Sequence, residues 1–109
     1  MNIEVPPTVA AYFAADRSGS VERVAQCFTA NAVVTDEGQV HTGREAIMKW
    51  KARSSQKYDY TVDPRSIAGD GQRAVVISRV TGNFPGSPID LTYDFRLDGD
   101  AITSLEIKP

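Results

Sequence analysis

The 109-residue sequence has very few of the side chains that bind metals or form cross-links. It contains one cysteine, Cys27, and one histidine, His41, and its acidic residues do not occur at the spacing of metal ligands. It also has no glycine-rich loop of the kind that binds phosphate groups before a helix. A lone cysteine cannot form an internal disulfide bond, which is typical of proteins in a reducing compartment. We therefore expect a cytoplasmic protein that uses no metal and no other cofactor.

A strong excess of charge and long apolar runs are missing as well. The net charge is −2 and the isoelectric point is near 5.3, whereas a nucleic-acid-binding protein normally presents a basic surface. No apolar run approaches the ~20 residues that a membrane span requires, and the first residues do not resemble a signal peptide. Because chains of this length usually form one core, we expect a single domain over residues 1–109 that binds neither nucleic acid nor membranes.

The first half of the sequence has the periodicity of helices. Apolar residues at helical spacing predict a helix over Val9–Asp16, with Asp16 as the one polar residue of its apolar face. A second helix is predicted over Val21–Phe28, with Ser20 as its cap. The segment Thr42–Glu45 has the pattern of a capping box and predicts a third helix that ends near Ser54 or Ser55. The residues of that helix expected to face inward are Ala46, Ile47 and Trp50.

The remaining segments have the alternation of strands. Ala32–Thr35 and Gln39–His41 predict a hairpin whose turn contains Gly38, a residue that readily adopts positive φ. Pro64 should mark a bulge or an edge strand, because proline cannot donate to a sheet. The loop Asn83–Pro88 is expected to shape either the rim of a cavity or a dimer contact. Longer strands are predicted over Tyr58–Asp63, Ala74–Val80, Ile89–Leu97 and Ala101–Lys108.

This order of elements predicts the α+β class. Helices that precede a run of antiparallel strands usually pack on one face of the sheet. We expect three N-terminal helices on a strongly curved, mostly antiparallel sheet that encloses a cavity, which is where small ligands usually bind.

The same order, together with the segment A-V-V-T-D-E-G (Ala32 to Gly38) and the following H-T-G-R-E-A-I (His41 to Ile47), resembles the nuclear transport factor 2-like superfamily. Within it the chain is most similar to the SnoaL-like group, which includes polyketide cyclases, and ketosteroid isomerases share the fold. The resemblance covers roughly Val5 to Ile107. It implies a cone-shaped fold and a homodimer formed through the convex face of the sheet.

The resemblance to ketosteroid isomerases also implies a site that moves a proton next to a carbonyl group. Asp36 corresponds in position to the base aspartate of those enzymes, and Tyr12 to a tyrosine that donates to the enolate oxygen. The third position is an acid in those enzymes and is Tyr93 here. We therefore expect Asp36 to transfer the proton and both tyrosines to stabilise the enolate of a small apolar carbonyl compound. The residues expected to line the ligand are Trp50, His41, Phe28 and Phe95.

Each candidate also has an ordinary structural interpretation. Asp36 precedes a glycine turn, where aspartate is common for its turn geometry alone. Tyr12 and Tyr93 fit a core in which each hydroxyl has one partner. His41 fits the surface or a position behind the ligand-contacting residues, and as the one side chain that ordinarily titrates near neutral pH it could instead act as an acid.

Three functions therefore stay open: an isomerase, cyclase or dehydratase, a non-catalytic small-molecule-binding domain, and a dimeric scaffold. They differ in the cavity. An enzyme needs several converging polar groups, a binding domain needs few, and a scaffold needs no empty space. Because the resembled superfamily hosts all three, the fold alone does not decide among them.

Overall fold

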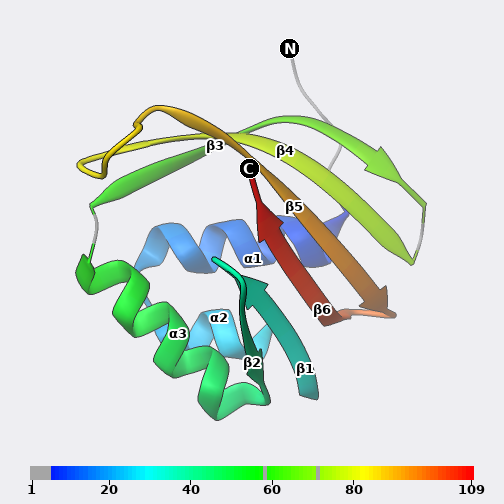
Figure 1. The fold of residues 1–109 in the computed structure, drawn as a ribbon. Helices are drawn as coiled ribbons and strands as arrows, with labels where there is room; N and C mark the ends of the chain where they lie inside the picture. The colour runs from blue at the N-terminus through cyan, green and yellow to red at the C-terminus, as the bar shows by residue number, and fades with distance from the viewer. Residues whose placement is uncertain (1–5, 58, 71) are drawn as a thin grey trace.

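The structure is a computed structural model that describes residues 6–57, 59–70 and 72–109. Three helices and six strands follow the predicted order, and the α+β class is confirmed. Tyr58, the predicted start of a strand, lies outside the described residues. The elements are α1 (Pro7–Ser18), α2 (Val21–Gln26), β1 (Phe28–Asp36), β2 (Gln39–Thr42), α3 (Arg44–Lys57), β3 (Tyr60–Gly69), β4 (Arg73–Gly82), β5 (Ile89–Asp98) and β6 (Ala101–Lys108) (Figure 1).

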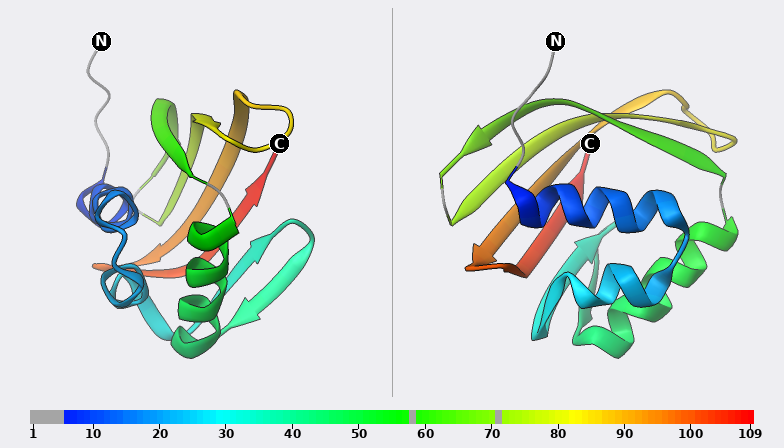
Figure 2. Two further views of the ribbon diagram at one scale, coloured as in Figure 1. Left: turned by 90° about the vertical axis from the view of Figure 1, so that its left-hand side faces the viewer. Right: turned by 180° about the vertical axis from the view of Figure 1, so that it is seen from behind.

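The strands form one mixed sheet in the order β2-β1-β6-β5-β4-β3, which is not closed into a barrel. β1 and β6 are parallel, and all other neighbouring strands are antiparallel. In Figure 1, β3, β4 and β5 arch above α1, and the sheet then turns downward through β6, β1 and β2. Figure 2 shows α1 and α2 on the concave side of this curve. Pro64 lies in the edge strand β3, and the pairing register shifts between Pro64 and Ser66, so both parts of its predicted role are confirmed.

The boundary between the second helix and the first strand differs from the prediction. Phe28 was expected to be the last apolar residue of a helix, but α2 ends at Gln26 and Phe28 is the first residue of β1. Phe28 pairs with Ile102 in β6, the parallel neighbour of β1. Apolar residues four apart suit a helix, but the distant strand β6 supplies pairing partners that extend β1 four residues further than predicted.

The start of α3 also differs by one residue. Gly43, with a φ of 89°, precedes the first helical residue, Arg44, so Thr42 is not the cap. The Glu45 carboxylate pairs with Lys49, 3.5 Å away, instead of reaching back. The Arg44 guanidinium donates two hydrogen bonds of 3.0 and 2.9 Å to the carbonyl oxygen of Phe28. These two bonds tie the start of α3 to β1 and so fix the helix against the sheet.

The core lies between the helices and the concave face of the sheet, and an aromatic cluster occupies part of it. The ring of Tyr12 meets Phe13, Phe28 and Phe95 edge to face at centroid distances of 5.4, 6.0 and 5.4 Å. Edge-to-face contacts at these distances are favourable and directional. The cluster therefore holds Tyr12 in one orientation, with its ring in the core.

Candidate functional site

A pocket of about 520 Å³ lies between α1, α3, the end of β1 and the inner face of the sheet. Its volume is in the range of sites that bind small molecules. The loop between β4 and β5 contributes Phe84 and Pro85 to its wall, so this loop lies at the pocket. The polar and aromatic side chains that line the pocket include Tyr12, Asp36, Trp50, Lys51, Tyr60 and Tyr93.

Asp36 reaches the pocket because it is the last residue of β1, directly before the turn. Glu37 and Gly38 form that turn with φ values of 53° and 74°, which matches the tight type I′ turn of hairpins. The indole N–H of Trp50 donates a 2.9 Å hydrogen bond to Oδ2 of Asp36. Oδ1 has no hydrogen-bond partner in the part of the chain that the structure describes. The carboxylate is therefore oriented by one oxygen, and the other is available to a ligand.

Tyr12 and Tyr93 extend from α1 and β5 and are only 1% and 5% exposed. Neither hydroxyl has a hydrogen-bond partner among the described residues, although both side chains line the pocket. Burial, followed by the negative charge of Asp16, raises the pKa of both phenols above the ordinary value. The two groups therefore stay protonated at neutral pH and can donate hydrogen bonds to a ligand oxygen.

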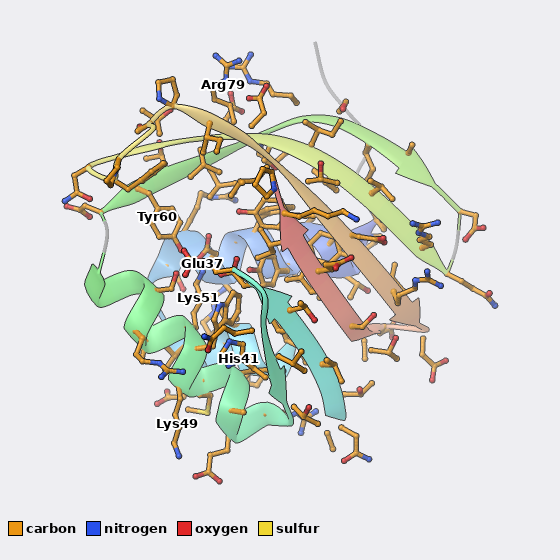
Figure 3. The ribbon with its side chains drawn as sticks, in the orientation of Figure 1. Glu37, His41, Lys49, Lys51, Tyr60 and Arg79 are labelled. Carbon is orange, nitrogen blue, oxygen red and sulfur yellow. The ribbon has the colours of Figure 1, made fainter. Side chains whose placement is uncertain are left out.

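A buried ion pair, which the sequence interpretation missed, lies in the same wall. The Lys51 ammonium is 2.5 Å from Oδ1 of Asp16 and donates a 2.7 Å hydrogen bond to the hydroxyl of Tyr60. That hydroxyl donates a 3.3 Å hydrogen bond to Oδ1 of Asp16. Burial lowers the pKa of Lys51, but the charge of Asp16 and the two hydrogen bonds raise it above the ordinary value overall. Lys51 is therefore a cation inside the pocket (Figure 3).

The sequence matches the family model described as a SnoaL-like domain over residues 9–105. The chain belongs to the SnoaL-like domain family. Comparison with curated proteins gives no match. Membership supports, at the level of the family, an isomerase-like, cyclase-like or small-molecule-binding role.

Three solved structures illustrate the likeness. A candidate polyketide cyclase from Sinorhizobium meliloti is 38% identical, with 95% of each chain covered and a TM-score of 0.91. A protein of ketosteroid isomerase-like fold from Catenulispora acidiphila, in complex with trimethylamine, is 25% identical, with 97% of this chain and 87% of that chain covered and a TM-score of 0.86. SalBIII, an epoxide hydrolase/cyclase-like enzyme with a role in pyran ring formation in the polyether salinomycin, is 24% identical. The match covers 92% of this chain and 85% of that chain, with a TM-score of 0.78. This last likeness shows the fold alone.

The structure brings four of the predicted site residues of this SnoaL-like protein to one pocket: Asp36, Tyr12, Tyr93 and Trp50. The other three lie elsewhere. Phe28 and Phe95 are fully buried and pack against the ring of Tyr12, behind the pocket wall. His41 lines a smaller neighbouring pocket of about 260 Å³, with its ring centroid 6.2 Å from that of Trp50. The predicted catalytic and ligand-binding roles of these seven residues stay predictions.

Two signals in the sequence point to the buried ion pair in retrospect. Asp16 is seven residues from Val9 on the otherwise apolar face of α1, and such a position is normally buried. Lys51 follows Ile47 by four residues on α3, so it lies on the same inward face as that fully buried residue. An acid and a base on two inward faces indicate a buried pair, but only the fold shows that they meet.

Residues 6–57, 59–70 and 72–109 contain no metal-binding cluster and no membrane-spanning helix. No three side chains of the histidine, cysteine, aspartate or glutamate type gather there as a metal site would require. None of the helices found there is long and apolar enough to cross a membrane.

Proposed function

We propose that this SnoaL-like protein enolises a small apolar carbonyl compound without a cofactor, as an isomerase, cyclase or dehydratase. The observation that carries the proposal is the presence of Asp36, Tyr12 and Tyr93 in the wall of one pocket of about 520 Å³. A carboxylate that accepts a proton and phenols that donate to an oxygen are the groups that enolisation requires. The similarity to a candidate polyketide cyclase supports the same class of reaction.

In the proposed reaction, Oδ1 of Asp36 takes a proton from the carbon next to the carbonyl group. The electron pair of that C–H bond forms a C=C bond, and the carbonyl π electrons move to the oxygen, which becomes an enolate. Tyr12 and Tyr93 donate hydrogen bonds to this oxygen and lower the energy of the transition state. Asp36, now a neutral acid, returns the proton to another carbon in an isomerisation. Trp50 keeps the carboxylate in place through Oδ2.

The pocket also bears on the two alternatives. A scaffold filled by its own side chains requires no empty space, and the volume of the pocket argues against it. A plain binding domain requires few polar groups, whereas two side-chain carboxylates, two ammonium groups and three phenols line this pocket. The bound trimethylamine in the relative from Catenulispora acidiphila favours small-molecule binding as the second candidate function. The outcome of mutating Asp36 distinguishes the two functions.

A thermal-shift assay with phenols tests the proposal, because a phenol resembles an enol without being a substrate. Wild type should gain stability of about RT ln(1 + [L]/Kd), which is roughly 2.7 kcal/mol at a hundredfold excess over Kd. Tyr12→Phe should lose most of this gain, whereas benzene derivatives without a hydroxyl should bind both proteins equally. Equal stabilisation by every apolar ligand, indifferent to Tyr12, would favour the binding domain instead.

We also propose the homodimer that the family resemblance implies, formed through the outer face of the sheet. On that face of β4, Ile77 is 42% exposed. It lies between two ion pairs that join β4 to β5, Arg73 with Asp94 at 2.8 Å and Arg79 with Asp90 at 2.9 Å. An exposed apolar residue bordered by charged pairs is compatible with a contact between two copies.

A further inference from the structure

We propose that the ammonium group of Lys51 is a subsite for an acidic oxygen of the ligand, such as an enol, phenol or carboxyl oxygen. The inference rests on the proposed function, because it identifies the chemical class of the compound that Asp36 and the two tyrosines would act on. It concerns a residue on α3 to which the reaction described above assigns no step.

The first support is the geometry of the ammonium group. Lys51 is 4% exposed, yet its side chain lines the pocket. An ammonium group has three N–H donors. One points to Asp16 and one to Tyr60. The third has no oxygen acceptor within the described ranges of the chain. A ligand oxygen in the pocket would supply that acceptor.

The second support is the energetics of burying such a pair. Removing two charges from water is costly, and a well-packed apolar pair at the same position would hold the elements together at least as well. Asp16 and Lys51 join α1 to α3, and Tyr60 adds β3. Apolar side chains would make the same connection at lower cost. A buried cation that lines a cleft is therefore better explained by a role toward a ligand.

The third support is the chemistry that the pocket disfavours. The Lys51 ammonium lies over the rings of Trp50 and Tyr60, 5.0 and 5.4 Å from their centroids. These aromatic faces are the surfaces that a ligand ammonium group would otherwise use. Because a cation already occupies them, the pocket favours a ligand that brings negative charge or an acidic hydroxyl. An oxygen placed there would also be in the pocket lined by the hydroxyls of Tyr12 and Tyr93.

The test compares two probes of similar shape, 4-nitrophenol at a pH where it is ionised and nitrobenzene, by isothermal titration. We expect wild type to bind the phenolate about tenfold to a hundredfold more tightly than nitrobenzene, the range typical of one hydrogen bond between charged groups. The charged and phenolic side chains that line the pocket and face the probe are Tyr12, Asp36, Glu37, Lys51, Tyr60, Tyr93 and Lys108, and Asp16 lies behind Lys51 as its ion-pair partner. All measurements are therefore made at one pH.

The informative variant is the double substitution Lys51→Met with Asp16→Leu. It removes one positive and one negative charge, so the net charge of the protein is unchanged and neither member of the buried ion pair is left without its partner. It should lose the preference for the phenolate and keep its affinity for nitrobenzene. Lys49→Met is the matched control, because Lys49 is an exposed lysine on the same helix, and it should bind both probes like wild type. Circular dichroism confirms that each variant is folded.

Three results would overturn the proposal: a phenolate preference that persists in the double variant, equal binding of both probes by wild type, or tighter binding of tetramethylammonium than of the phenolate. Failure of the proposed reaction has a different signature. Asp36→Asn should lose turnover, whereas its preference for the phenolate should be at least as large as that of wild type, because the substitution removes a negative charge from the same pocket. Loss of the preference in Lys51→Met with Asp16→Leu therefore tests the subsite separately from the reaction.

Discussion

The ammonium group of Lys51 is held by side chains from two other elements, Asp16 in α1 and Tyr60 in β3. We expect Lys51→Met to destabilise the protein by about 3–5 kcal/mol, because it leaves the Asp16 carboxylate buried without its partner. Adding Asp16→Leu should restore most of the lost stability. Urea unfolding measures both changes. A single variant as stable as wild type would show that the pair is not the buried contact described here.

Single residues also show how far the sequence could predict the site. The family resemblance placed Asp36, Tyr12 and Tyr93, and the structure brings all three to one pocket. It did not place Asp16 and Tyr60, which are 44 residues apart and meet only because β3 arches above α1 in the fold (Figure 1). Phe28 was expected to line the ligand, and the structure packs its ring edge to face against the ring of Tyr12. The type of a side chain predicts which reactions it can take part in, but the fold decides which side chains contact one another.

Among the elements, the turn between β1 and β2, which lines part of the pocket, contains a strained residue. Glu37 has a φ of 53°, a conformation that costs side-chain-bearing residues other than asparagine and aspartate about 1 kcal/mol or more. Asparagine followed by glycine is the preferred pair in such turns.

We therefore expect Glu37→Asn to raise the free energy of unfolding by about 0.5–1 kcal/mol. Gly38→Ala should lower it by about 1 kcal/mol, because Gly38 has a φ of 74°. Chemical denaturation of the two variants and wild type measures both effects. A decrease in stability for Glu37→Asn would mean that the Glu37 side chain stabilises the turn by contacts absent from the structure.

The elements differ in how well their sequences predicted them. The strands β4, β5 and β6 lie within two residues of their predicted bounds, because apolar and polar residues alternate along most of each strand. The predicted end of α2 was wrong. Val24 and Phe28 have helical spacing, but Phe28 pairs with β6, and this pairing decides where β1 begins. The parallel pair β1 and β6 joins segments far apart in the chain, so no local sequence pattern predicts this pairing.

At the scale of the whole molecule, three buried groups make the free energy of unfolding depend on pH in the alkaline range. The pKa values of Tyr12, Tyr93 and Lys51 are all raised in the folded protein. The folded state therefore holds these protons more tightly than the unfolded chain. Their contribution is complete below the ordinary pKa values, near pH 10, and is lost progressively as the pH rises toward the folded values.

We expect the free energy of unfolding to fall above about pH 10 by up to about 1.4 kcal/mol per pH unit for each group. Tyr93→Phe should remove the contribution of one group to this slope. Near neutral pH the dependence of the free energy of unfolding on pH should be the same as in wild type. Urea unfolding at a series of pH values gives the slope. A flat dependence between about pH 10 and pH 11 would contradict the burial of these groups.

The proposed reaction depends on one chemical step, the transfer of a proton from carbon to Asp36. Exchange of the α-protons of apolar ketones in deuterated water, followed by mass spectrometry, measures that step without the natural substrate. Wild type should exchange the α-protons of a ketone that fits the pocket of about 520 Å³ at least a hundredfold faster than Asp36→Asn. Tyr12→Phe should be intermediate, because it removes one of two oxygen donors. Exchange by Asp36→Asn at the wild-type rate would contradict the account.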